Sequence, residues 1–336
     1  MTLDPASAAP PRLTSSDGLV AAYVLDGEGR GQPISWGGLS DWRPEHGTLW
    51  VHLDRLQERA ARWLMRESGL APVVAEAVMA EETRPRVDSF DSGLLLVLRG
   101  ANLNPGAAPE DMVSLRIWAD EHRVVTVRGR RVMSVEDVRE ALARGHGPSN
   151  SGQLLTALLS QLTDRLEPVV SELDDVVDEL EERATEAADS SLRRELSVAR
   201  RRVIALRRHM APQRAVTLRL QSEPVDWIAD LDRLHVREAH DQLTRYLEDL
   251  DEARDRATVT HEEITQRVAE DTNRTIYLLS VVATIFLPLS LLAGLLGMNV
   301  GGIPGGSESW GFAAVIGLTL ALAVLEILLI RRLRVL

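Results

Sequence analysis

Two patterns of apolar residues divide the chain. From residue 17 to about 147, short runs of β-branched and aromatic residues are bounded by Gly, Asp or Pro. Such runs predict strands, here at residues 19–25, 48–53, 93–98, 113–118 and 123–127. Helical patterns lie between them, at residues 55–67, 72–79 and 135–142. We therefore expect a cytosolic α/β domain with a mixed sheet and helices over residues 17–147, after a flexible tail at residues 1–16.

Three glycines crowd one turn of this domain, at Gly27, Gly29 and Gly31. Their spacing is not the G-x-G-x-x-G of a dinucleotide-binding loop. A hairpin turn is the better interpretation.

From residue 153 to 270 the pattern is helical, which predicts a cytosolic helical region over residues 148–271 with breaks near 189–190, 211–212 and 224. Residues 164–186 are dense in carboxylates, whereas residues 192–209 are dense in Arg. These two helices either pair as an antiparallel hairpin with opposite charges facing, or present two solvated faces, since surface ion pairs are individually weak.

A long helix is predicted from residue 226 to 271. Leu243, Leu250, Ala257 and Ile264 follow one another at seven-residue spacing. This repeat indicates packing against neighbouring helices. Because no break separates the helix from the apolar run that follows, we expect one continuous helix that forms a stalk and enters a membrane.

Two apolar segments end the chain. No charged residue occurs between Arg274 and Glu308. Residues 276–296 would reach roughly 31 Å as a helix, close to the hydrocarbon thickness of a bilayer. A second apolar segment covers residues 310–330. We therefore expect a transmembrane domain over residues 272–336, with spans at about 276–297 and 310–330 and an outer loop at 298–309.

The arginines around these spans predict their orientation. Arg274 precedes the first span, and Arg331, Arg332 and Arg334 follow the second, whereas the loop has no basic residue. The positive-inside rule then places both termini in the cytosol. Residues 1–16 have no apolar core of a signal peptide, which agrees with this orientation. Two helices cannot enclose a water-filled path, so a transport function would need oligomerisation.

The amino-acid composition excludes several classes of function. The net charge of −12 argues against nucleic-acid binding and suits the attraction of cations. There is no Cys, which excludes thiolate catalysis and Cys-based zinc sites. There is also no Lys, since all 38 basic residues are Arg, which excludes P-loop ATPases, protein kinases and Schiff-base enzymes. No nucleophile–base pair is evident, and we expect neither enzymatic activity nor a cofactor.

The first span has one face of small and weakly polar residues. One row at seven-residue spacing is Asn273, Ser280, Leu287 and Gly294, and the parallel row is Ile276, Ala283, Ser290 and Gly297. Small residues let membrane helices approach closely, but they also leave room for a hydrated ion along a pore. In an oligomer the two interpretations overlap.

The run NRTIYLLSVVATIFLPLSLLAGLLGMNVGGIPGG, at residues 273–306, resembles the CorA superfamily of divalent metal-ion transporters. An Asn stands at the cytosolic entrance, an ATIFLPLS-like core follows, and a Gly-Met-Asn triplet closes the first span. Four segments are similar to the zinc-transporter branch, ZntB: the loop NVGGIPGGSESWGF, WVHLDR at 50–55, EETRPR at 81–86 and LRGANLNPGAAPEDMVSLRIW at 98–118.

This resemblance implies a homopentamer with a funnel-shaped cytosolic domain, in a bacterial inner membrane, whose first span lines a central pore. Asn299 would form an outer ring of amides and Asn273 an inner one, while Gly297 and Met298 hold the shape of the triplet. The remaining candidate pore residues are Ser280, Thr284, Leu287 and Ser290. The resemblance further suggests proton-coupled uptake of zinc.

The chemistry of these residues suits a hydrated ion. A ring of Asn amides can accept hydrogen bonds from the water shell of a cation without replacing that shell. Zinc prefers thiolate and imidazole, yet all eight His residues lie outside the spans, so the zinc assignment rests on the resemblance. His261-Glu262-Glu263 is not H-E-x-x-H, and we assign no metal site.

Two carboxylates near the membrane are further candidates. Glu308 is the only charge in the outer loop, where it would form an acidic ring that attracts cations or be an ordinary exposed side chain. Glu326 is the only carboxylate inside a span. It would either carry protons or, more favourably, pair with Arg274 or Arg331.

Two other functions compete with zinc transport. One is a CorA-type magnesium and cobalt channel, which competing metals in a transport assay would distinguish. The other is a membrane-anchored metal sensor or scaffold, for which Asn299→Ala would leave function intact.

Overall fold

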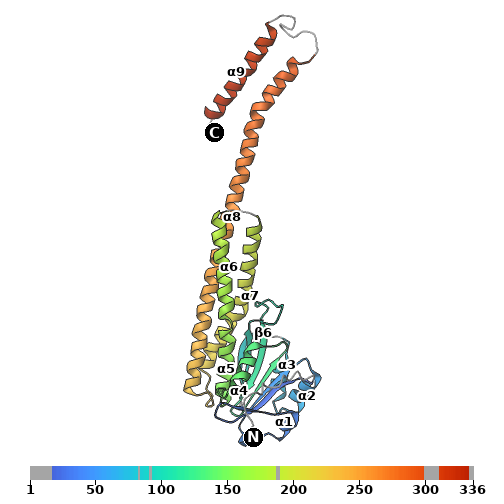
Figure 1. The fold of residues 1–336 in the computed structure, drawn as a ribbon, viewed down its shortest axis with the longest axis vertical. Helices are drawn as coiled ribbons and strands as arrows, with labels where there is room; N and C mark the ends of the chain where they lie inside the picture. Colours follow the sequence, from blue (N-terminus) through green and yellow to red (C-terminus); the bar gives the residue numbers. More distant parts are fainter. Residues whose placement is uncertain (1–16, 82–83, 91–92, 187–189, 299–309, 333–336) are drawn as a thin grey trace, which may run out of the picture. The chain divides into compact units, whose positions relative to one another are not determined.

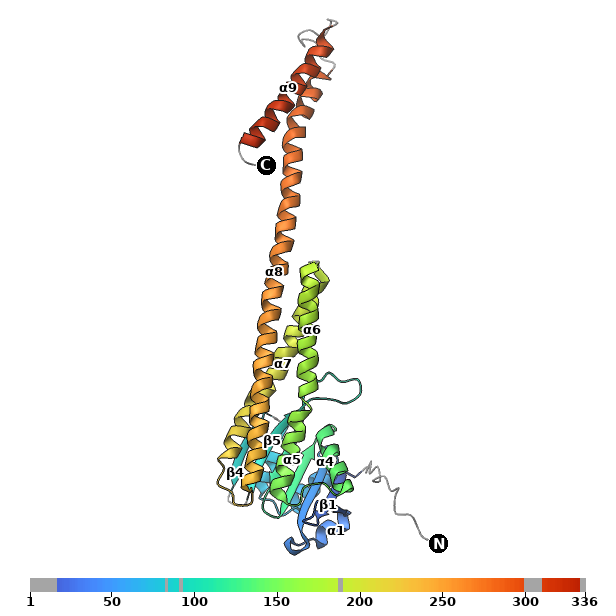
Figure 2. The same cartoon turned by 60° about the vertical axis from the view of Figure 1, so that its left-hand side comes forward.

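The computed structural model describes residues 17–81, 84–90, 93–186, 190–298 and 310–332. Figures 1 and 2 show a sheet with helices, followed by long helices. The chain divides into two compact units, Met1–His261 and Glu262–Leu336, and the division falls inside helix α8 (Asp230–Leu296). Fold class is as predicted: a mixed sheet with helices, then long helices, then two apolar helices.

The sheet has seven strands in the order β2-β1-β3-β7-β6-β5-β4. All neighbours are antiparallel except β3 and β7, which are parallel. Their bounds are β1 Leu19–Leu25, β2 Gly31–Pro33, β3 Thr48–Asp54, β4 Arg86–Phe90, β5 Gly93–Gly100, β6 Val113–Ala119 and β7 Arg123–Arg128. All five predicted strands are present, within two residues at their ends.

Strands β2 and β4 were not predicted, and they are the two edge strands of the sheet. Edge strands pair on one side only, so they need little apolar sequence. In β4 only Val87 is fully buried, and β2 is three residues long. The predicted glycine turn joins β1 to β2, and Gly27 and Gly29 have φ of 81° and 94°. This left-handed backbone is accessible to Gly without strain.

Successive side chains along the strands point to opposite faces of the sheet and pack into two separate hydrophobic cores. In β5, Leu94, Leu96 and Leu98 pack into one core with helices α4 (Met133–Arg144) and α5 (Ser151–Asp164). Leu95, between them, packs into the other core, which also contains residues of α1 (Trp36–Asp41), α2 (Glu58–Arg66) and α3 (Pro72–Met79). A short 3-10 helix, η1 (Pro44–His46), precedes β3. Because side chains alternate between the two faces of a strand, both faces of the sheet are buried.

The helical region contains α6 (Glu167–Glu186), α7 (Ser190–Gln221) and the first part of α8. The predicted break at residues 211–212 is wrong, because Pro212 lies inside α7. Proline costs about 3 kcal/mol inside a helix. Met210 and Gln213 on either side of it are fully buried, and we attribute the survival of the helix to this packing. A break between α5 and α6, at residues 165–166, was not predicted.

Ion pairs join these three helices. Arg202 of α7 lies 3.5 Å from Glu172 of α6, which is a pair of the predicted kind. Arg183 of α6 and Glu195 of α7, 2.7 Å apart, pair with the opposite polarity. The acidic face of α6 is also used by α8, where Arg256 contacts Asp174 and Asp178. The predicted seven-residue repeat is buried, with Leu243, Leu250 and Ala257 each at most 1% exposed. Apolar packing and ion pairs thus both hold these helices together in the first unit, Met1–His261, which is called the soluble unit below.

Candidate functional site

The end of α8 and helix α9 (Gly311–Arg332) are the two helices, among the described residues, that are long and apolar enough to cross a membrane. None of either apolar window is buried within the chain. The exposed side chains include Leu279 at 70%, Leu287 at 73% and Phe312 at 78%. A core helix of a soluble protein would be mostly buried, so this surface needs lipid or other helices to cover it.

Helix α8 continues from its charged part into the apolar segment without interruption and passes through Pro288. This is the continuous helix that the sequence predicts, although it begins at Asp230 rather than 226. Because α8 is unbroken, positions three, four and seven residues apart share a face. Asn273, Ser280, Thr284, Leu287 and Ser290 therefore lie along one stripe, and all five side chains are exposed.

Two hydroxyl groups on this stripe bond to their own helix. Ser280 Oγ donates to the carbonyl oxygen of Ile276 at 2.9 Å, and Thr284 Oγ1 donates to that of Ser280 at 2.8 Å. The hydroxyl proton of each side chain is therefore engaged in a hydrogen bond within the helix. The lone pairs of each hydroxyl oxygen remain free to accept hydrogen bonds. The stripe can accept hydrogen bonds from water around a cation, and it has no charge that would hold the ion tightly.

The helix ends at the predicted triplet. Gly297 N donates to the carbonyl oxygen of Ala293 at 2.9 Å, and a Cβ at position 297 would lie only 3.0 Å from that oxygen. Glycine is therefore the residue that fits without displacing the helix end. Met298 is 51% exposed. Asn299 and Glu308 lie outside the described residues.

In the described part of the apolar helices, two buried polar side-chain atoms have no hydrogen-bond partner. They are the hydroxyl of Tyr277 in α8 and Oε2 of Glu326 in α9, both buried. The predicted pairing of Glu326 with Arg274 is absent from the described ion pairs, and the side chain of Arg331 lies outside the described part.

In the described part of the chain, no group of three or more His, Cys, Asp or Glu side chains is placed to hold a metal ion. The eight histidines include His52, which is fully buried in the sheet. Burial, together with Arg128 and Arg139 nearby, holds the pKa of His52 well below its usual value of 6.5. His52 is therefore a neutral core residue.

A mixed sheet, long helices and two exposed apolar helices define a membrane protein with a large soluble part. The chain belongs to the CorA-like Mg²⁺ transporter protein family, whose match covers residues 45–332. The family consists of transporters rather than enzymes.

Individual relatives agree with this assignment. The divalent cation transporter CmaX of Pseudomonas aeruginosa is 40% identical over 321 residues, which cover 94% of this chain and 96% of the relative. The zinc transport protein ZntB of Pectobacterium carotovorum is 38% identical, over 88% of this chain and 89% of the relative. The structure of full-length CmaX matches with a TM-score of 0.83 at 39% identity, over 95% of this chain and 98% of that one.

The stripe could be found from the sequence because it lies on one helix. Residues that come together from distant parts of the chain could not be found in this way. One such group is a set of arginines around a cavity in the soluble unit, which includes Arg55, Arg99 and Arg116. These three lie in segments that resemble ZntB, but the sequence alone does not show that the segments meet.

Proposed function

We propose that this chain transports divalent metal cations across a membrane, with zinc as its principal substrate. The observation that carries the proposal is the exposed, uncharged stripe of α8, in an apolar helix that no other described part of the chain covers. The relatives named as zinc and divalent-cation transporters support the choice of ion class.

Transport needs several copies of the chain. Two helices cannot enclose a water-filled path, and the stripe lies open on a single chain. We propose a homopentamer in which the first span of each copy lines a central pore. Both termini face the cytosol of a bacterial inner membrane, as the arginines that flank the spans favour.

Specific residues have specific roles in this proposal. Asn299 forms the outer amide ring and Asn273 the inner one, and Glu308 attracts cations to the outer mouth. Gly297 and Met298 hold the triplet in shape. The wall of the pore between the two rings is formed by Ser280, Thr284, Leu287 and Ser290.

The chemistry of the pore fits a cation that keeps its water shell. Amide and hydroxyl oxygens bind that shell weakly, which favours passage over retention. Such a pore discriminates little between divalent cations. Magnesium is the second candidate, and the observation that favours it is the family to which the chain belongs.

The test is flux into liposomes. Purified protein would be reconstituted with a zinc-sensitive dye inside, and zinc added outside with and without an inward proton gradient. We expect zinc to enter, faster with the gradient, and Asn299→Ala to abolish entry. Magnesium entry without zinc entry would move the chain to the magnesium candidate, and no flux of either ion would contradict transport.

Two threonines provide a matched pair for the pore wall. Thr284 in α8 and Thr319 in α9 each donate a hydrogen bond of 2.8 Å to the carbonyl four residues earlier. Thr284→Ala and Thr319→Ala therefore remove the same local bond. We expect only Thr284→Ala to change flux, since only Thr284 lies on the stripe. Equal effects would contradict the assignment of the stripe to the pore.

A further inference from the structure

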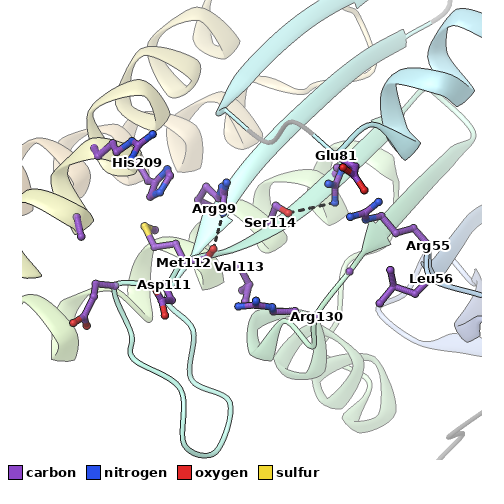
Figure 3. Close-up of a pocket in the computed structure, with 15 residues that line it drawn as sticks. Arg55, Leu56, Glu81, Arg99, Asp111, Met112, Val113, Ser114, Arg130 and His209 are labelled. Carbon is purple, nitrogen blue, oxygen red and sulfur yellow. Dashed lines mark hydrogen bonds between the residues drawn. The ribbon is translucent and has the colours of Figure 1, made fainter.

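A cavity of about 660 Å³ lies in the soluble unit, between strand β6, the segments that follow β3 and β7, and helix α7. Figure 3 shows its lining. Five arginines face it, whereas only three carboxylates do. The arginines are Arg55, Arg99, Arg116, Arg130 and Arg208, and the carboxylates are Glu81, Glu110 and Asp111.

This positive charge is not neutralised within the described part of the chain. Glu110 is already engaged by Arg202, at 3.2 Å. Arg55, Arg116, Arg130 and Arg208 have no carboxylate oxygen within 4.0 Å among the described ion pairs. Elsewhere arginines of this chain are commonly paired, and the chain has a net charge of −12. An excess of positive charge around one cavity therefore stands out.

Arg116 is the most enclosed of these groups. It is 1% exposed; Nη2 donates to the carbonyl oxygen of Ala80 at 2.8 Å, and Nη1 donates to Ser114 Oγ at 3.3 Å. Its Nε is buried without a hydrogen-bond partner, as is Nε of Arg55. Burial, and then the charges of Arg55, Arg99 and Arg86, lower the pKa of Arg116 to about 10. Arg116 is thus charged at neutral pH, and a buried charge needs a counter-charge.

The geometry of arginine indicates which anion would fit. Guanidinium groups bind phosphate through two parallel hydrogen bonds, and clusters of Arg are typical of phosphate recognition. The volume is far larger than a halide or a bare phosphate needs and lies in the range of small-molecule sites. Leu56, Met112, Val113 and Ala205 provide apolar lining for a carbon skeleton.

We propose that this cavity binds a small organic phosphate, with its phosphate groups held by Arg55 and Arg130 and attracted by the buried charge of Arg116. The lining joins β6 to α7 through Arg208 and His209. A ligand there ties the sheet to α7 and stabilises the soluble unit. The proposal concerns this unit alone and does not depend on which cation is transported.

The test uses the full chain, purified in detergent and treated with EDTA so that metal–ligand complexes do not form. The probes are ATP, inorganic phosphate and sodium chloride at matched ionic strength. Calorimetric titration measures the binding of each probe, and thermal unfolding measures its effect on the melting temperature. We expect saturable binding of one ATP per chain with a rise in melting temperature, weaker binding of inorganic phosphate, and no effect of chloride.

Single substitutions then test whether ATP binds in this cavity. Arg55→Gln and Arg130→Gln should each weaken ATP binding at least tenfold, because each removes one charged donor. Arg116→Gln should do the same, but it can impair folding, and the exposed Arg130 provides the safer variant. Arg237→Gln is the control, since Arg237 is exposed on α8, lies outside the cavity lining and has no ion pair in the described part.

Two outcomes would overturn the proposal. One is equal binding of ATP by the wild type and by the Arg55 and Arg130 variants, and the other is the absence of saturable ATP binding by the wild type. In the second case, light scattering would also test whether those variants lose the oligomeric state. Such a loss would make the cavity a contact for acidic groups of a second copy.

Discussion

His52 and Thr126 are register partners on the parallel strands β3 and β7, and their side chains lie 2.9 Å apart, from Nδ1 to Oγ1. Thr126 Oγ1 also accepts a hydrogen bond from Trp50 Nε1 at 2.9 Å and donates one to the carbonyl oxygen of Val51 at 3.1 Å. Since a hydroxyl has one proton, His52 must donate from Nδ1. Its Nε2 is then a bare acceptor, buried without a partner.

This arrangement predicts a fall in stability at mildly acidic pH. Protonation of His52 would place a charge and an unsatisfied N–H in the core, so its folded-state pKa is well below 6.5. The unfolded chain binds the proton more readily. Stability is therefore complete above about pH 6.5 and falls as pH drops toward the folded-state pKa, by up to about 1.4 kcal/mol per pH unit.

The measurement is the melting temperature of the full chain between pH 7.5 and 5.5, compared with His52→Asn. The Asn amide can still donate to Thr126 but does not titrate. We expect the variant to lose less stability than the wild type across this range. Parallel curves for the two proteins would contradict the prediction. The pKa of His209 is also lowered, by burial and then by Arg99 and Arg208, and this contribution is common to both proteins.

Thr126→Val should destabilise the soluble unit by roughly 2 to 4 kcal/mol, because it leaves two buried donors, on Trp50 and His52, without an acceptor. Thr126→Ser keeps the hydroxyl and loses one methyl group, so it should cost about 1 kcal/mol. Denaturant unfolding followed by tryptophan fluorescence measures both. A valine variant as stable as the serine variant would show that the shared hydroxyl contributes nothing.

Arg256 of α8 contacts Asp174 and Asp178 of α6 and lies 3.6 Å from Glu181. Arg256→Met should destabilise the soluble unit by about 1 kcal/mol, because the partners are partly exposed and solvent screens them. Raising the salt concentration should reduce this difference.

Arg254→Met is the control for Arg256, since the ion pairs of Arg254 among the described residues lie within α8, with Asp251 at 3.3 Å and Asp255 at 2.8 Å. We expect a change of less than about 0.5 kcal/mol. Equal losses for the two variants in thermal unfolding would mean that the contact between helices adds nothing beyond local pairing.

Gly297→Ala should reduce cation flux at least about tenfold, equivalent to about 1.4 kcal/mol in the barrier. The added Cβ would meet the carbonyl oxygen of Ala293 at 3.0 Å, so the end of α8 would have to shift by a few tenths of an ångström. Gly317→Ala in α9 is the control, because its Cβ meets nothing within 4 Å. The liposome assay measures both at equal amounts of inserted protein, and full flux through Gly297→Ala would contradict the proposed role of the triplet.

Features that depend on neighbours along the chain could be predicted from the sequence. Strand β1 and helix α3 have the predicted bounds, Leu19–Leu25 and Pro72–Met79, because local apolar patterning and Pro at the start of a helix set them. The stripe from Asn273 to Ser290 could also be predicted, since helical periodicity alone places its residues on one face of α8. The continuity of α8 followed from the absence of any helix-breaking signal between its charged and apolar parts.

The remaining features depend on contacts between distant parts of the chain. The edge strands β2 and β4 exist because a neighbouring strand pairs with polar sequence, and Pro212 stays inside α7 because its neighbours are buried. Arg55, Arg116 and Arg208 meet at one cavity although more than 150 residues separate the first from the last. Their proximity comes from the packing of β6 against α7 and the segment after β3, and packing between distant segments leaves no periodic trace in the sequence.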